Sequence, residues 1–129
     1  MSDIDAAEDW LDSWVAGVDE RAARAVDLAR QVASLTATAS SDDDTVTVTV
    51  GSNGQIERLD LDDRVQRLSG RDLSRRILAV MRAAQHRLSE QVAAQVQQTV
   101  GADTETGRAV VDAFGRRFPE PPAEAADEQ

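Results

Sequence analysis

The residues best suited to chemistry in this sequence are the arginines between residues 64 and 100, where seven arginines face only two acidic residues. If this segment is helical, five of its arginines form two rows. The first row is Arg71, Arg75 and Arg82, and the second row is Arg76 and Arg87. The members of the first row project within about 40° of one another. Guanidinium groups bind phosphate bidentately, so the rows predict a surface that follows a phosphate backbone. The alternative is a solvated face neutralised by acidic residues elsewhere.

Material for catalysis or metal binding is sparse. The chain has no cysteine and a single histidine, His86, so it offers no thiolate nucleophile and no histidine pair for a metal. We interpret His86 as a solvated residue on the polar side of its helix. Asp60, Asp62 and Asp63 lack the spacing of a calcium loop and are expected to form a solvated strand end or a helix cap. The sequence predicts no enzyme, no metal site and no cofactor.

The charge and hydropathy of the chain limit the kinds of partner that it can bind. The 129 residues carry a formal net charge of -10, and residues 1–63 hold fifteen Asp and Glu against four Arg. An acidic total argues against indiscriminate nucleic-acid binding but permits binding through one local basic face. No apolar run approaches the length of a membrane span, and the acidic N-terminus does not resemble a secretory signal. We therefore expect a cytoplasmic protein that does not associate with membranes.

The N-terminal segment predicts a long helix over about residues 5–37, roughly 50 Å in length. Apolar or small residues recur there in alternating steps of four and three: Ala7, Leu11, Trp14, Val18, Ala25, Leu28, Val32 and Leu35. This spacing is typical of a heptad seam. Arg21 interrupts the seam, and it either points into the open gap of a dimer, together with Arg24 or Arg30, or snorkels out of a loosely packed seam. Trp10 and Trp14 lie on the seam side and are expected at a dimer or partner interface.

A β-hairpin is expected next. Residues 36–44 form a polar linker, with the aspartates of 42–44 solvated. Residues 45–50 then alternate strictly between threonine and valine, the strongest strand signal in the chain. The Gly51–Gly54 turn lacks the Lys-Ser/Thr of a phosphate loop and leads into a second strand over residues 55–61. The parity of its apolar residues predicts a bulge near Glu57 and Arg58.

A second long helix is predicted over about residues 71–100, followed by a short helix over about 104–117. Phe114 and Phe118 are one helical turn apart and are expected either to close over the tryptophan region or to bind a partner helix. Residues 119–129 are proline-rich and acidic, and they are expected to be a disordered tail. Residues 1–118 would then form one domain.

These elements predict an α+β fold in which two long helices flank an antiparallel hairpin or small sheet. Helices of about 45–50 Å protrude from a domain of this size, and a lone hairpin leaves strand edges open. A second copy would cover both, so we expect a homodimer. The residues predicted at the dimer or partner interface are Trp10, Trp14, Val46, Val48, Val50, Leu59, Leu61 and Ile77.

The long acidic helix, the segment TVTVTVGSNGQIERLDLDD and the second long helix together resemble the YbaB/EbfC family of nucleoid-associated proteins. The resemblance spans roughly residues 10–105. It implies a tweezer-shaped α-β-β-α homodimer in the bacterial cytoplasm that binds double-stranded DNA with little sequence preference. On this hypothesis the residues that contact DNA are Arg21, Arg24, Arg71, Arg75, Arg76, Arg82 and Arg87.

The lysine-free, alanine-rich composition is typical of actinobacteria, where YbaB-like chains also resemble accessory proteins of type VII secretion loci. The alternative function is therefore a protein-binding adaptor with the same dimer, which would use Trp10, Trp14 and the acidic surfaces. The two hypotheses differ in the arginines of 64–87, because DNA binding requires them to be exposed and an adaptor allows them to be paired internally.

Overall fold

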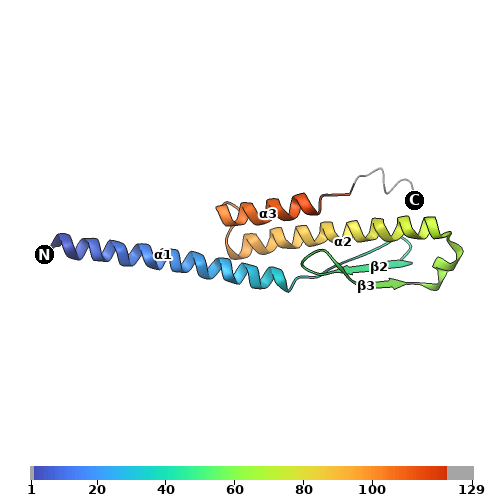
Figure 1. The fold of residues 1–129 in the computed structure, drawn as a ribbon, viewed down its shortest axis with the longest axis horizontal. Coiled ribbons are helices and arrows are strands. Elements are labelled where there is room, and N and C mark those ends of the chain that lie inside the picture. The colour runs from blue at the N-terminus through green and yellow to red at the C-terminus, as the bar shows by residue number, and fades with distance from the viewer. Residues whose placement is uncertain (1, 122–129) are drawn as a thin grey trace.

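The computed structural model describes residues 2–121 and has the predicted α+β fold, with one layer of helices against a small antiparallel sheet (Figure 1). The elements in chain order are α1 (Ser2–Ala33), β1 (Ala37–Ser40), β2 (Val46–Val50), β3 (Ile56–Leu61), the 3-10 helix η1 (Asp63–Arg67), α2 (Gly70–Thr99) and α3 (Glu105–Arg117). None of the helices in this part of the chain is long and apolar enough to cross a membrane.

The core lies between α2 and one face of the sheet. The three strands are antiparallel in the order β1-β2-β3. Val46, Val48 and Val50 of β2 are fully buried, and the neighbouring positions of β1 are the buried Ala37 and Ala39. Five buried residues of α2 belong to the same core: Val80, Ala84, Leu88, Val92 and Val96. The alternation of valine and threonine in β2 therefore divides a dry face from a hydroxyl-bearing face.

The hydroxyl-bearing face is joined by cross-strand hydrogen bonds. The hydroxyls of Thr38 and Thr49 are 2.9 Å apart, and those of Ser40 and Thr47 are also 2.9 Å apart. Both pairs join residues directly opposite one another in the β1–β2 register. These side-chain bonds add to the backbone ladder and fix the register of the short edge strand β1.

The strand β1 corrects the predicted linker over residues 36–44. The first helix ends at Ala33 rather than at residue 37, and Ala37–Ser40 pair with β2. Alanine and serine have low strand propensity, so composition gave no strand signal here. The small side chains of Ala37 and Ala39 are instead buried in the core beneath α2. The buried-exposed alternation of the four residues is the pattern of a half-buried strand.

The predicted bulge is confirmed. Val50 pairs with Ile56 whereas Thr49 pairs with Arg58, so Glu57 is the extra residue in β3. At the adjacent turn, Gly54 has a φ of 81°, a left-handed conformation that glycine adopts without steric cost. The Gln85 side chain of α2 donates a hydrogen bond to the Gly54 carbonyl at 2.9 Å, which holds the turn against the helix.

The C-terminal helix packs on α2 and closes this end of the sheet. The rings of Phe114 and Phe118 are 6.1 Å apart, and Phe118 is buried against Gly54. Arg117 donates to the Asn53 carbonyl at 3.1 Å. The phenylalanines therefore cover the β2–β3 turn and not the tryptophans, which corrects that expectation. Most of the predicted tail, residues 122–129, lies outside the described residues.

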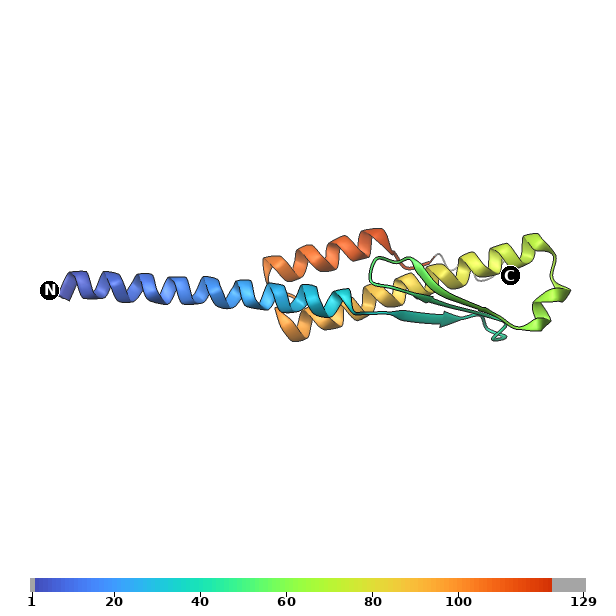
Figure 2. The same cartoon turned by 60° about the horizontal axis from the view of Figure 1, so that its bottom comes forward.

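Only the C-terminal part of α1 packs on the rest of the chain. Leu28 is buried, and the side chain of Gln31 accepts a hydrogen bond from Thr99 at 2.7 Å. The preceding residues extend away from the body as a single helical arm in both ribbon views (Figures 1 and 2). The predicted seam is thus internal to the chain only near Leu28, and its first half is exposed.

Candidate nucleic-acid interface

Three of the predicted arginines form an open basic row. Arg71, Arg75 and Arg82 lie on the side of α2 away from the buried stripe, and all three are exposed. Within residues 2–121 the side chains of these three arginines make no hydrogen bond and no ion pair. Ser69 caps the helix by accepting from the Asp72 amide at 3.1 Å, and this cap fixes where the row begins. The row therefore presents three unpaired guanidinium groups to the surroundings.

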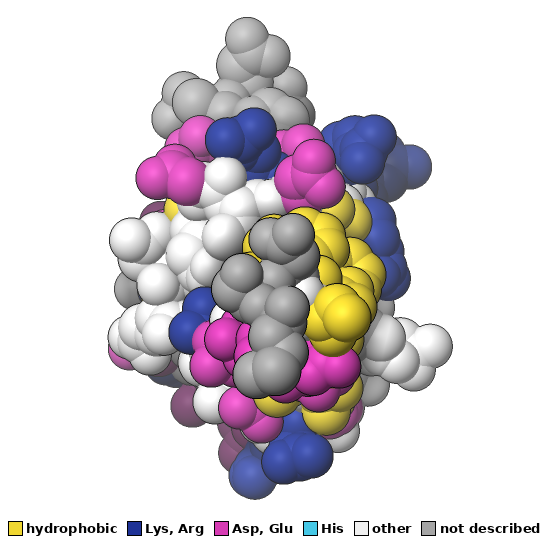
Figure 3. Space-filling model, turned by 90° about the vertical axis from the view of Figure 1, so that its left-hand side faces the viewer, with side chains coloured by type: hydrophobic (Ala, Val, Ile, Leu, Met, Phe, Trp, Pro, Cys, Tyr) yellow, Lys and Arg dark blue, Asp and Glu magenta, His cyan; other side chains and the backbone are white. Residues whose placement is uncertain are grey.

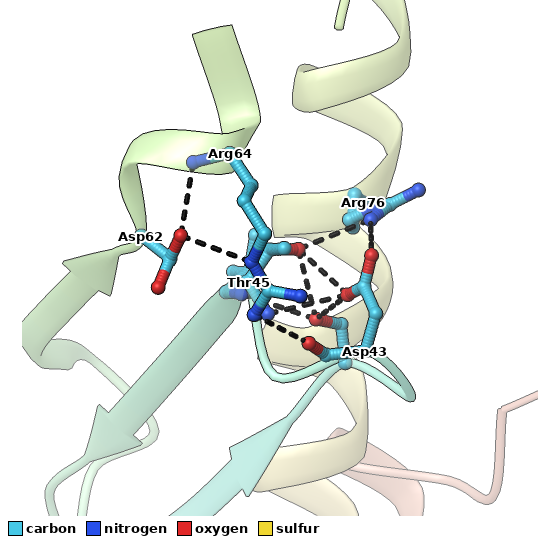
Figure 4. A network of polar contacts seen from close by, with 7 residues as sticks. Asp43, Thr45, Asp62, Arg64 and Arg76 are labelled. Carbon is cyan, nitrogen blue, oxygen red and sulfur yellow. Dashed lines mark hydrogen bonds and ion pairs between the residues drawn. The ribbon is translucent and has the colours of Figure 1, made fainter. Parts of the chain in front are cut away.

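Arg76 belongs to a different structure, although it is adjacent to Arg75 in sequence. Its guanidinium lies 2.5 Å from a carboxylate oxygen of Asp43 and 3.0 Å from the Thr45 hydroxyl, and its side chain is only 20% exposed (Figure 4). Thr45 is buried and also donates to Asp43 at 2.7 Å. Arg76 thereby connects α2 to the β1–β2 turn. The guanidinium of Arg76 is therefore engaged within the chain, unlike that of Arg75.

The same network explains the aspartates of this turn. Hydrogen bonds from Thr45, together with those from Ser41 and Arg76, hold the pKa of Asp43 well below its ordinary value of 3.8. Arg64 donates to the Asp43 carbonyl at 2.9 Å and also pairs with Asp62 at 3.1 Å (Figure 4). Asp43 is thus a structural residue rather than part of a solvated linker, which corrects the sequence-based interpretation.

Arg87, the other member of the second row, also makes an internal contact. Its guanidinium donates to the Thr38 carbonyl of β1 at 2.7 Å, although the residue as a whole is exposed. This bond engages a backbone group of the edge strand. The second predicted row is therefore held against the β1 side of the sheet, and the first row alone is unpaired. Arg67, in the last turn of η1, is also exposed, and the sequence analysis did not single it out.

Arg21 and Arg24 are not brought to this surface. Both lie on the α1 arm, which extends from the opposite end of the molecule to the one where α2 begins (Figure 1). The Nε of Arg21 donates to the Gly17 carbonyl one turn earlier, at 3.2 Å, and the residue is exposed. Although Arg21 occupies a seam position, its charge is therefore not buried within one chain. These two arginines and the α2 row cannot act as one site in a single chain.

The remaining candidates have structural roles or none. Asp62 caps η1 by accepting from the Arg64 amide at 2.9 Å, as a helix cap is expected to do, and this bond lowers its pKa. His86 is half-buried rather than solvated, with its Nε2 3.7 Å from Glu90, which corrects that expectation. Within residues 2–121, no group of three or more His, Cys, Asp or Glu side chains is arranged to hold a metal ion.

The predicted interface residues fall into three groups by exposure. Val46, Val48 and Val50 are fully buried in the core of the chain itself, so they offer no surface to a partner. Leu59 and Leu61 on β3 are exposed by 42% and 44%, and Trp10 and Trp14 are exposed on the arm. Ile77 is partly buried against the core.

A comparison with models of known protein families shows the family to which this chain belongs. The model of the YbaB/EbfC DNA-binding family matches residues 11–103, from the arm through the sheet to the end of α2. The chain belongs to this family. Comparisons with curated proteins and with solved structures give no match. The match to the YbaB/EbfC family supports a DNA-binding, nucleoid-associated role.

Proposed function

We propose that this YbaB/EbfC protein binds duplex DNA without catalysis, through contacts from Arg71, Arg75 and Arg82 to the phosphate backbone. The observation that carries the proposal is that these guanidinium groups are exposed and unpaired, whereas Arg76 and Arg87 are bonded to the sheet region. Contacts from guanidinium groups to phosphates position a protein on the duplex but carry no sequence information. Binding is therefore largely independent of sequence, and the protein acts at the nucleoid.

The binding form in this proposal is a homodimer. Within residues 2–121 the outer edge of β3 has no partner strand, and the apolar side chains Ile56, Leu59 and Leu61 are exposed. Leu78 of α2 is also exposed. It lies on the same side of α2 as Gln85, whose side chain is hydrogen-bonded to the β2–β3 turn. An open edge next to an apolar patch is a template for association, and a second copy covers both. Pairing doubles the number of arginine rows.

Dimerisation is tested by charge insertion. The variant Leu59→Asp/Leu61→Asp places carboxylates on exposed positions of β3, which the monomer tolerates and a dimer interface does not. Sedimentation equilibrium of the wild type is expected to give twice the chain mass of 13.9 kDa, and the variant the mass of one chain. A wild type that sediments as a monomer at micromolar concentration contradicts this part of the proposal.

DNA binding is tested by fluorescence anisotropy with a random-sequence duplex over a salt series. The wild type is expected to bind with an affinity that falls as salt rises, because phosphate contacts release counterions. The variant Arg71→Ala/Arg75→Ala/Arg82→Ala is expected to lose most of that affinity and most of its salt dependence. The exposed Arg30→Ala variant, which removes one positive charge from α1, serves as the control for a loss of charge away from the row. Equal binding by wild type and triple variant refutes the assignment of the site.

A further inference from the structure

The α1 arm, defined here as residues 4–24, is an exposed helix with no other part of the described chain against it. Every residue of the arm is exposed except Gly17, which is partly so. Trp10 and Trp14 are exposed by 65% and 55%, and the other large apolar residues exposed there are Ile4, Leu11, Val15 and Val18. Exposed tryptophan on a surface helix is unusual for a chain without a partner, because large contiguous apolar patches mark interaction sites.

The arm is amphipathic, with apolar and acidic faces on different sides. At about 100° per residue, the large apolar side chains share a stripe roughly 140° wide. Anchors at positions 4, 7, 11, 14 and 18 have the spacing of a helix that packs along another helix. Six acidic residues occupy the other side within an arc of about 120°: Asp5, Glu8, Asp9, Asp12, Asp19 and Glu20. The view onto the N-terminal end shows hydrophobic and acidic side chains gathered on different flanks (Figure 3).

We propose that the arm binds a basic amphipathic helix of another protein, which packs its apolar side on the tryptophan stripe. Residues 2–20 contain seven acidic residues and no basic one. This charge repels the phosphate backbone of DNA, and it repels the same segment of a second copy. A helix with lysine or arginine beside its apolar stripe satisfies both faces, because its cations reach Glu8 and Asp19 at the stripe border.

The arm and the arginine row then act on different ligands. They lie at opposite ends of the molecule (Figure 1), so a basic helix on the arm does not cover Arg71, Arg75 or Arg82. A protein bound to DNA through α2 can hold a second protein through α1. This inference does not depend on the DNA proposal, because the exposed tryptophans and the acidic face belong to α1 alone.

The two tryptophans make the arm its own reporter, because the chain contains no others. The probe is a tryptophan-free peptide of leucine and lysine, patterned as an amphipathic helix of about 18 residues, or roughly 27 Å. Titration of the full protein with this peptide is expected to shift tryptophan emission to shorter wavelength and to saturate. The affinity is expected to fall as salt is added, since partly exposed charges are screened. A leucine–glutamate peptide of the same pattern is expected to leave the emission unchanged.

Variants assign the site. Trp10→Ala/Trp14→Ala is expected to weaken binding of the labelled leucine–lysine peptide at least about tenfold, because aromatic anchors carry much of the affinity of such interfaces. Alanine is the best helix former, so the arm stays helical in this variant, which circular dichroism checks. Glu8→Gln/Asp12→Asn/Asp19→Asn is expected to weaken binding at low salt only. Val26→Ala, which truncates an exposed apolar residue of α1 outside the arm, is the control and is expected to bind as the wild type does.

Three outcomes overturn the proposal. The first is equal peptide affinity in the wild type and the double tryptophan variant, which places the peptide elsewhere. The second is binding of the leucine–glutamate peptide as tightly as the leucine–lysine peptide, which shows that charge does not contribute to recognition. The third is wild-type emission at short wavelength that moves to longer wavelength on dilution, which shows that a second copy covers the arm. DNA affinity of the double tryptophan variant, expected to be unchanged, separates this test from the test of the α2 row.

Discussion

Two neighbouring arginines are expected to respond oppositely to the same substitution. Arg75 is exposed and unpaired within residues 2–121, whereas Arg76 is bonded to Asp43 and to the buried Thr45. Arg75→Ala should therefore weaken DNA binding and leave folding stability unchanged. Arg76→Ala should lower folding stability and leave the salt dependence of DNA binding unchanged. Each variant is the other's control, since both remove one positive charge from consecutive positions of the same helix.

The size of each effect follows from what the side chain contacts. One phosphate contact contributes about 0.9 to the slope of log affinity against log salt, which is roughly fivefold in affinity at about 0.15 M salt. Arg75→Ala is thus expected to cost about fivefold per chain, and about thirtyfold if both copies of a dimer contact DNA. Arg76→Ala removes a charged donor from the hydroxyl of Thr45, which costs about 1–2 kcal/mol of folding free energy.

The assays are fluorescence anisotropy on a random duplex over a salt series and urea unfolding followed by circular dichroism. The reasoning is refuted if Arg76→Ala reduces the salt slope as much as Arg75→Ala does. It is also refuted if Arg75→Ala is the variant that unfolds at lower urea concentration. A result in which both variants lose affinity equally while both remain fully stable would place DNA contacts on both rows of arginines.

Three further predictions concern stability and spectroscopy. Because hydrogen bonds from Thr45 and its neighbours lower the pKa of Asp43, its ionised form stabilises the fold above its ordinary pKa of 3.8, and this contribution is lost as pH falls below that value. The stability advantage of the wild type over Asp43→Asn should therefore shrink in urea titrations below about pH 4. Gly54→Ala should destabilise the fold by about 2 kcal/mol or more, since the residue is left-handed and the ring of Phe118 fills the space, whereas Gly17→Ala on the open arm should only increase helical circular dichroism. Tryptophan emission of a monomeric variant should change little on urea unfolding, because both tryptophans are already exposed, and a large red shift would contradict this.

Sequence periodicity predicted the elements that bury a continuous face. Val46, Val48 and Val50 alternate with threonines, and the apolar stripe of α2 repeats at helical spacing, so both signals came from the residues that form the core. The bulge at Glu57 was predictable because the apolar residues of β3 change parity. The strand β1 was not predictable, because its small residues have low strand propensity and are buried by a helix that lies about forty positions later in the chain.

The sequence identified the candidate arginines, but it could not distinguish those with free guanidinium groups from those bonded within the chain. Arg75 and Arg76 differ by one helical position, and the partner that engages Arg76 is Asp43, which is thirty-three residues away. Only the tertiary position of the β1–β2 turn distinguishes a free guanidinium from a bonded one. Helical spacing likewise placed Trp10 and Trp14 on one side of α1, but it did not show that the body of the chain ends before reaching them.

The distribution of charge resolves the apparent conflict between a net charge of -10 and a family that binds DNA. Screening limits the reach of an exposed charge to about 8 Å at physiological ionic strength. The α1 arm and the first half of α2 lie at opposite ends of the molecule, and a helix of thirty residues is about 45 Å long. The acidic arm therefore exerts little repulsion on a duplex held by Arg71, Arg75 and Arg82. Local charge, rather than the sum over the chain, determines which ligand each end attracts.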